Sequence, residues 1–271
     1  MTDAPRPLPP EQLGFESIVY EKAPPRATIR LNRPEVLNAF DFRMLRELAR
    51  ACEDASWDDE IRVVVVTGTG RAFCVGADLR SWGAELVGNP NEYWKWFGAF
   101  QDLHDRLRGI GKPTVARIQG ICVGGGNELQ MACDLAVMVD DATIRHVGPE
   151  HGSVPAGGAT QWLPLLVGDR RAREILMLCE PISAAQAVEW GLVNAAVPAG
   201  DLDAAVDRYV ESLARKLPQT MRYTKAQLNF WRDLSWAATV PHARDWLALS
   251  MLGEEAQGAI ADFLARPRKD G

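Results

Sequence analysis

The sequence lacks the features that define several classes of protein. Its five cysteines are odd in number and include no CxxC pair, so they indicate neither a disulfide framework nor a zinc site, and we expect reduced, mostly buried thiols. No stretch reaches the roughly 18 to 20 apolar residues that cross a bilayer, and the proline-rich start has no apolar signal-peptide core. These absences predict a cytoplasmic protein with no membrane partner and with a flexible leader over residues 1–14.

An excess of positive charge is also missing. The formal net charge is -6 and the isoelectric point is near 5.4, which argues against a polyanionic partner such as nucleic acid. The sequence has no basic stripe interleaved with aromatic residues, the pattern of an RNA-binding protein. The segment GTGRAF at 68–73 follows a valine-rich run, but Phe73 stands where a dinucleotide-binding motif needs its third glycine. Nucleic-acid binding and dinucleotide binding are therefore both disfavoured.

Apolar runs and helical spacings alternate along the first part of the chain. The pattern predicts a hairpin of two strands over 17–20 and 27–31, strands over 61–67, 113–119 and 135–139, and helices over 43–54 and 92–108. Such alternation is typical of an α/β fold with largely parallel strands, because helices must cover a sheet that is apolar on both faces.

The chain becomes helical after about residue 200. Apolar spacing predicts helices over 202–217, 221–234 and 242–252. This part carries Trp231, Trp236 and Trp246, which present more aromatic surface than a small helical segment can bury by itself. We therefore place a boundary near residue 200 and expect the C-terminal part to pack on the main body or on another subunit.

Three motifs carry a family resemblance. They read LNRPEVLNA at 31–39, AFCVGADLR at 72–80 and GICVGGGNEL at 120–129, and ACDLA at 132–136, GGATQ at 157–161 and AVEWGLVN at 187–194 follow them. In this order and spacing they resemble the enoyl-CoA hydratase/isomerase (crotonase) superfamily over about residues 15–200. The resemblance implies an α/β, crotonase-like spiral of ββα turns over 15–199 that holds the active site. It also implies a C-terminal helical segment over 200–271 for assembly into a homotrimer or a dimer of trimers, which is a hexamer.

The resemblance further implies the substrate and the group that polarises it. The substrate would be an acyl-CoA thioester, with coenzyme A as part of the substrate and with no metal or redox cofactor. The backbone N–H groups of Ala77 and Gly125 would form an oxyanion hole for the thioester oxygen. Preorganised donors in a dry site stabilise such charge, and the glycines at 124–126 would open a helix near Asn127 whose positive end points at that oxygen. From the residues alone, a plain flexible loop is the alternative.

One glutamate is the candidate for proton transfer. Glu128 falls in the first turn of that predicted helix and matches one of the two glutamates of a typical hydratase; from the residues alone it could simply stabilise the helix dipole. Gly148 stands at the position of the family's second glutamate, and we expect it to leave room beside the acyl group. Glu150, His146 and His151 are candidates to replace the missing carboxylate, although histidines near such a loop are often structural.

The loop at 148–153, GPEHGS, narrows the resemblance to one branch of the superfamily. It is similar to 1,4-dihydroxynaphthoyl-CoA synthases and to ring-opening hydrolases of 6-oxocyclohex-1-ene-1-carbonyl-CoA and 2-ketocyclohexanecarboxyl-CoA, and LCEP at 178–181 is most similar to the hydrolases. Three functions stay open. They are hydration of an unsaturated acyl-CoA through an enolate held in the oxyanion hole, ring-opening C–C hydrolysis of a cyclic 2-oxo- or 6-oxo-acyl-CoA, and a non-catalytic or RNA-binding role.

The remaining candidates would contact the substrate. Arg80 matches a position where the family often carries a lysine beside the CoA phosphates, and Arg33 and Arg266 could add charge; each alone would be a solvated surface arginine. The aromatic run at 93–97 and its surroundings suggest Trp82 and Trp94 as walls of an acyl pocket, although much of that run must be helix core. Further binding candidates lie within the motifs, at Val36, Asp78, Leu79 and Gly124.

Overall fold

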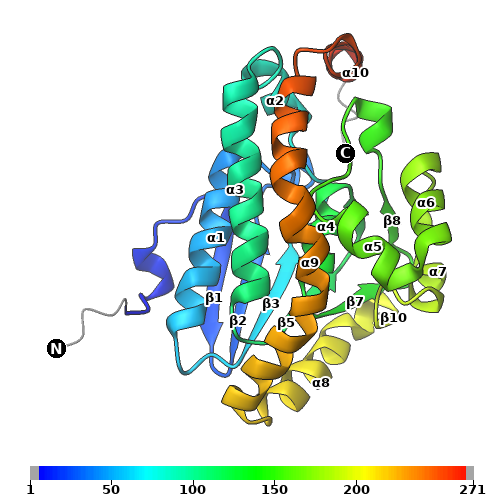
Figure 1. Ribbon diagram of the computed structural model, residues 1–271. Helices are drawn as coiled ribbons and strands as arrows, with labels where there is room; N and C mark the ends of the chain where they lie inside the picture. Colours follow the sequence, from blue (N-terminus) through cyan, green and yellow to red (C-terminus); the bar gives the residue numbers. More distant parts are fainter. Residues whose placement is uncertain (1–5, 267–271) are drawn as a thin grey trace.

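The computed structural model of the protein describes residues 6–266 and contains two sheets (Figure 1). The larger sheet has the strand order β1-β2-β3-β5-β7-β10 and the smaller sheet β4-β6-β8-β9. β1 with β2 and β8 with β9 pair antiparallel, and the other pairs are parallel. The strands are β1 Ile18–Ala23, β2 Arg26–Leu31, β3 Val63–Gly68, β4 Ala72–Cys74, β5 Thr114–Ile118, β6 Ile121–Val123, β7 Leu135–Val139, β8 Thr143–Arg145, β9 Ile182–Ser183 and β10 Ala195–Val197.

Successive strands alternate between the two sheets. β3, β5 and β7 enter the larger sheet, while β4, β6 and β8, which follow them directly, enter the smaller one. Each turn therefore adds one strand to each sheet, which confirms the predicted α/β spiral. The helices are α1 Phe42–Trp57, α2 Leu79–Glu85, α3 Pro90–Gly109, α4 Gly125–Ala132, α5 Ala159–Val167, α6 Asp169–Leu178, α7 Ala184–Glu189, α8 Leu202–Ala214, α9 Pro218–Ser250 and α10 Glu254–Ala265, with 3-10 helices η1 Pro10–Gln12, η2 Pro34–Val36, η3 Gly148–His151 and η4 Ala199–Asp201.

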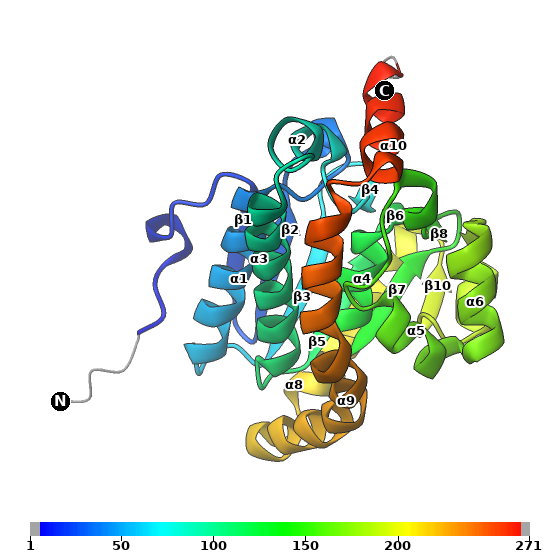
Figure 2. The same ribbon diagram turned by 45° about the horizontal axis from the view of Figure 1, so that its top comes forward.

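The core forms because the central strands are apolar on both faces. Every residue of β3 is buried, so this strand requires cover on each side. α1 begins where the Asp41 carboxylate accepts a hydrogen bond from the Met44 N–H at 2.7 Å, and it turns an apolar face inward. Figures 1 and 2 show α1, α3 and α9 side by side along one face of the larger sheet.

The C-terminal part differs from the prediction in one respect. The helices predicted over 221–234 and 242–252 are a single helix, α9, of 33 residues with Pro241 inside it. Trp236 and Val240, in the predicted gap, are buried. The Trp236 indole N–H donates to Asp105 of α3 at 2.7 Å, so packing on the body holds the helix together across the proline, which removes only one backbone donor.

Part of the predicted flexible leader lies against the body. Leu13 is buried, and the Leu8 N–H donates to Asp54 of α1 at 2.7 Å. Residues 1–5 lie outside the described residues. The predicted boundary near residue 200 stays a prediction.

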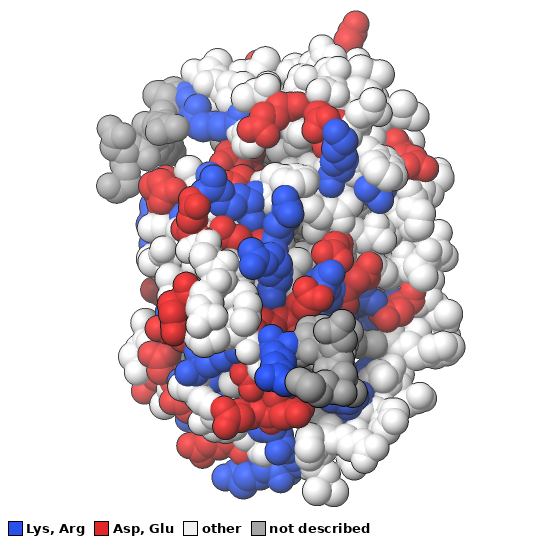
Figure 3. Space-filling model, turned by 90° about the vertical axis from the view of Figure 1, so that its left-hand side faces the viewer, with Lys and Arg blue, Asp and Glu red and all other residues white. Residues whose placement is uncertain are grey.

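The cysteines, the surface charges and the helix lengths bear on the expectations from composition. All five cysteines are free and buried, as predicted. On the face shown in Figure 3, acidic and basic side chains are interspersed. No helix in the described part of the chain combines the length and the apolar content needed to cross a membrane.

Candidate active site

A cavity of about 110 Å³ lies where α3, the start of α4, the loop before α2 and η3 meet. One wall is aromatic and comes from α2 and α3: Trp82, Tyr93, Trp96, Phe97 and Phe100. The cavity brings together nine of the predicted site residues: Ala77, Leu79, Trp82, Gly124, Gly125, Glu128, His146, Gly148 and His151. The other candidates lie outside its lining: Arg33, Val36, Asp78, Arg80, Trp94, Glu150 and Arg266.

Two residues of the cavity have backbone N–H groups without an acceptor within residues 6–266. The Phe40 N–H donates to the Gly76 carbonyl at 2.7 Å, and the Asp78 N–H donates to the Phe40 carbonyl at 2.9 Å. The Ala77 N–H, between these two bonds, takes no part in the pairing. Gly125 is the first residue of α4, where N–H groups have no partner within the helix. Within residues 6–266 neither N–H donates a hydrogen bond.

The glycines bring these two segments together. A Cβ on Gly76 would lie 2.8 Å from the Gly125 nitrogen, and the φ of Gly76 is +84°, which side chains rarely adopt. A Cβ on Gly126 would collide with the Cys74 carbonyl of β4. These positions therefore need glycine. α4 starts at Gly125, two residues before the predicted start, and its positive end lies at the cavity.

Glu128 presents a buried carboxyl group to the same cavity. Its Oε1 accepts a hydrogen bond from the Ala159 N–H at 3.1 Å. Burial raises the pKa of this carboxyl group from 4.5 to about 7, and the N–H groups of Ala159 and Gly157 oppose the shift. A carboxyl group with such a pKa can both accept and return a proton near neutral pH.

Tyr93, the first residue of the aromatic run at 93–97, is a polar residue of the cavity that the sequence did not single out. It is buried in α3 and lines the cavity. Burial raises the pKa of its hydroxyl, as does the charge of Glu128, while the Ser153 hydroxyl opposes the shift. The aromatic run predicted either a pocket wall or helix core, and no local signal decides between the two for Tyr93.

Of the three residues considered as replacements for the second glutamate, the structure places the two histidines at the cavity and the glutamate outside it. His146 is buried at the cavity and His151 is half-buried beside it, 5.8 Å from the Phe263 ring between centroids. Burial lowers the pKa of both histidines. Glu150 instead turns outward and pairs with Arg145 at 2.7 Å, so its carboxylate is not placed at the cavity.

Gly148 lines the cavity but does not leave the expected room for a side chain. A Cβ at this position would lie 2.7 Å from the Ser153 carbonyl and 3.3 Å from Pro155. A contact under 3.0 Å with backbone forces the loop to move. The expectation of open space was wrong because residues 153–155 fold back over Gly148, which the sequence pattern does not show.

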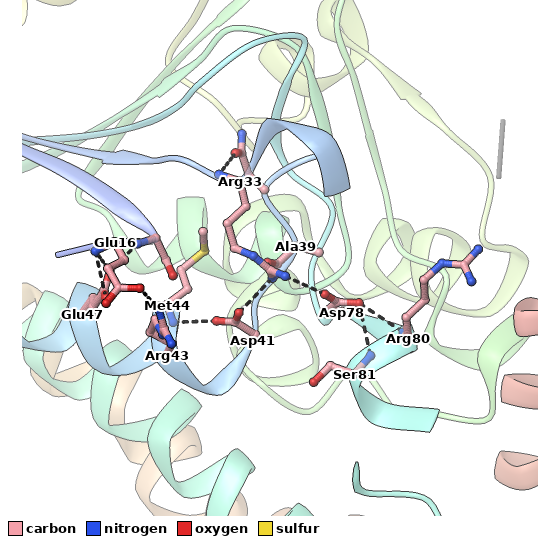
Figure 4. Close-up of polar contacts among 12 residues, drawn as sticks. Glu16, Arg33, Ala39, Asp41, Arg43, Met44, Glu47, Asp78, Arg80 and Ser81 are labelled. Carbon is pink, nitrogen blue, oxygen red and sulfur yellow. Dashed lines mark hydrogen bonds and ion pairs between the residues drawn. The ribbon is translucent and has the colours of Figure 1, made fainter. Parts of the chain in front are cut away.

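Arg33 lies outside the cavity lining and joins two neighbouring segments of the chain by polar contacts (Figure 4). Its guanidinium donates to the Ala39 carbonyl at 2.7 Å and to Asp78 at 3.0 Å. Asp78 also accepts from the Arg80 N–H at 3.1 Å and thereby caps α2. These contacts hold the segment that carries Ala77. Val36 is half-buried in η2.

The remaining candidates lie toward α9 and α10. The Arg80 guanidinium lies over the Phe263 ring at 5.8 Å and points away from Asp78 in Figure 4. Arg266 is exposed, and its charge acts to lower the pKa of His151. Trp94 is exposed, donates to Asp245 at 3.0 Å and stacks on Arg244. Its interpretation as a pocket wall was therefore wrong.

The sequence and the fold are similar to those of known proteins. The profile of the enoyl-CoA hydratase/isomerase family matches residues 26–248. A 6-oxocyclohex-1-ene-1-carbonyl-CoA hydrolase from Geobacter metallireducens is 30% identical over 92% of this chain and 82% of its own length. An enoyl-CoA hydratase/isomerase structure from Mycobacterium paratuberculosis has a TM-score of 0.85 at 26% identity, covering 91% of this chain and 98% of that one. One from Xanthobacter autotrophicus Py2 has 0.81 at 28%, covering 91% and 97%. The chain therefore belongs to the enoyl-CoA hydratase/isomerase family, within the crotonase superfamily.

Proposed function

We propose that the protein adds water to an unsaturated acyl-CoA thioester. The proposal depends on one observation: a buried carboxyl group with a raised pKa, Glu128, shares a cavity with two backbone donors, Ala77 and Gly125, that have no internal acceptor. Coenzyme A enters as part of the substrate. The reaction needs no metal or redox cofactor, because backbone donors meet the charge that develops on the thioester oxygen.

The geometry supports a single-carboxylate mechanism. Ionised Glu128 takes a proton from water as the water oxygen attacks the β carbon of the acyl group, and the electrons of the C=C bond move onto the thioester oxygen. The N–H groups of Ala77 and Gly125 hold that enolate oxygen, with the N-terminus of α4 behind it. Protonated Glu128 then returns the proton to the α carbon, which completes the addition of water.

Ring opening is the second candidate, and the hydrolase relative at 30% identity favours it. Water would attack a ring ketone, the bond between the ketone carbon and the α carbon would break, and the electron pair would become the same thioester enolate. Glu128 would take the proton from water and return it to the α carbon, giving a carboxylic acid and an intact thioester. Both reactions use the same oxyanion hole.

Turnover of a panel of thioesters tests these two reactions. The panel holds crotonyl-CoA, cyclohex-1-ene-1-carbonyl-CoA and two cyclic oxo-acyl-CoAs. These are 6-oxocyclohex-1-ene-1-carbonyl-CoA and 2-oxocyclohexane-1-carbonyl-CoA. We expect slow hydration of crotonyl-CoA, since one positioned acid/base contributes about 100- to 10,000-fold and the second is absent at Gly148. We expect a cyclic substrate, of the kind that the name of the hydrolase relative gives, to exceed crotonyl-CoA in kcat/KM. A crotonyl-CoA value near the diffusional ceiling of roughly 10⁸ M⁻¹s⁻¹ would rule out this preference.

Assembly into a trimer or hexamer is a further part of the proposal. α9 exposes several large apolar side chains, including a tryptophan with 69% of its surface accessible: Leu228, Phe230, Trp231, Leu234, Trp246 and Leu249. Exposed apolar area of this extent is typical of an interface. Light scattering should give three or six times the 29.9 kDa of one chain. Trp231→Asp should lower that mass, whereas Phe42→Asp on α1 should not; a wild-type monomer at micromolar concentration would contradict assembly.

A further inference from the structure

Two residues that line the cavity each carry a buried ring nitrogen without a hydrogen-bond partner in the described part of the chain. Within residues 6–266, Nε1 of Trp82 and Nδ1 of His146 are buried without a hydrogen-bond partner, and both residues line the cavity. The other residues with such an atom, among them His104 and Trp162, lie outside the lining. A buried donor without an acceptor costs free energy that a suitably placed ligand oxygen would recover.

A short polar chain reaches one side of the His146 ring. The Gln130 amide donates to Asn127 Oδ1 at 2.8 Å, which turns the Asn127 amide nitrogen toward His146 Nε2, also at 2.8 Å. Nε2 is then the acceptor, so the proton of the neutral ring sits on Nδ1. Burial lowers the pKa of His146 to about 4, so the ring is neutral at pH 7. The polar chain therefore holds a neutral N–H donor in a residue that lines the cavity.

The acceptor for this donor is not the thioester oxygen, because Ala77 and Gly125 serve that oxygen in the proposed function. A hydrocarbon acyl group has no oxygen of its own and would leave the His146 donor without a partner. An acyl group with a second oxygen would satisfy it. We propose that His146 selects acyl-CoA substrates with a carbonyl or hydroxyl oxygen on the acyl group, by donating its Nδ1–H to that oxygen. This proposal rests on the proposed function.

Such a donor would also assist ring opening. A hydrogen bond to a ring ketone polarises the carbonyl toward attack by water without giving up a proton, because the neutral ring keeps its N–H. Selection is steep for this kind of contact, because a site built to hydrogen-bond an oxygen rejects the analogue that lacks it. His146 is in this sense a specificity-determining residue.

Matched ligand pairs test the proposal. The pairs are acetoacetyl-CoA with butyryl-CoA, and 2-oxocyclohexane-1-carbonyl-CoA with cyclohexane-1-carbonyl-CoA. Dissociation constants are measured by calorimetry in the Glu128→Gln background, so that turnover does not consume the ligand. With His146 present, at least one oxygenated member should bind about 10-fold more tightly than its partner. His146→Phe should abolish that preference while changing the Kd of the unoxygenated member by less than about 2-fold.

A second pair of variants separates loss of the N–H donor from loss of folding. His146→Asn and His146→Leu have similar size and both give up the contact with Asn127, but only asparagine keeps an N–H on the Nδ1 side. The asparagine variant should retain part of the preference and the leucine variant none, at matched melting temperatures.

Each contrary result has its own meaning. Equal weakening of both members of a pair by His146→Phe would show a structural role and overturn the proposal. Equal binding of both members with His146 present would overturn it while the acyl-CoA function stands. If none of the thioesters bound, the proposed function itself would fail.

Discussion

Replacing Gly125 with proline is expected to lower kcat/KM about 100- to 1,000-fold, the usual effect of removing one oxyanion-hole donor. Proline has no N–H, and its ring would occupy the place of the hydrogen that faces the cavity. The substitution is compatible with the helix, because Gly125 is the first residue of α4 and proline is favoured at that position. Steady-state turnover of the best thioester in the panel measures the loss.

Alanine at the same position is the matched control. A Cβ on residue 125 would meet Gly76, Phe40 and Phe100 at 3.3 Å in either variant, so Gly125→Ala measures the effect of that atom alone. Gly125→Ala keeps the N–H and should keep most of the activity. A folded Gly125→Pro variant that matches Gly125→Ala in kcat/KM would exclude the N–H of residue 125 from the oxyanion hole.

The parts of the fold that the sequence predicts are those decided by local patterns. The strand predicted over 135–139 has those bounds in the structure, because it is a short apolar run with clear ends. α9 was predicted as two helices because Pro241 interrupts the local signal. What keeps it continuous is the contact of Trp236 with Asp105, 131 residues away along the chain. Such contacts leave no trace in the spacing of apolar residues.

In the candidate site, too, the residues predicted correctly are those that a local motif decides. The glycine-rich motifs predict that Ala77 and Gly125 lie together, because glycine is the residue that allows two backbone segments to approach closely. The roles of Arg33 and Trp94 could not be predicted, since they depend on side-chain partners, Asp78 and Asp245, that lie 45 and 151 residues away. Whether an exposed-looking arginine or an aromatic residue faces a cavity depends on tertiary packing.

Glu128→Gln is expected to lower turnover about 100- to 10,000-fold, the range for loss of one positioned acid/base. Glutamine keeps the size of the side chain and can still accept the Ala159 N–H, so the Kd for a CoA thioester should change little. Glu150→Gln is the matched control. Its carboxylate pairs with Arg145 outside the cavity, and its loss should leave kcat/KM within a few-fold. Nearly unchanged turnover in Glu128→Gln would move the acid/base role to His146 or His151.

The same Glu128→Gln variant should alter how stability depends on pH. In the folded protein the pKa of Glu128 is raised from 4.5 to about 7, so between these values the unfolded carboxyl group loses its proton while the folded one keeps it. The folded state then binds more protons than the unfolded state, and the wild-type free energy of unfolding falls as pH rises through this window. Glutamine does not titrate, so this loss is absent from the variant. Urea unfolding at pH 5 and pH 8 should therefore show the variant gaining stability relative to wild type at the higher pH. A relative stability that stays constant with pH would mean that the folded and unfolded states hold this proton equally well, and that Glu128 is not the buried, neutral-pH acid/base that the proposed mechanism needs.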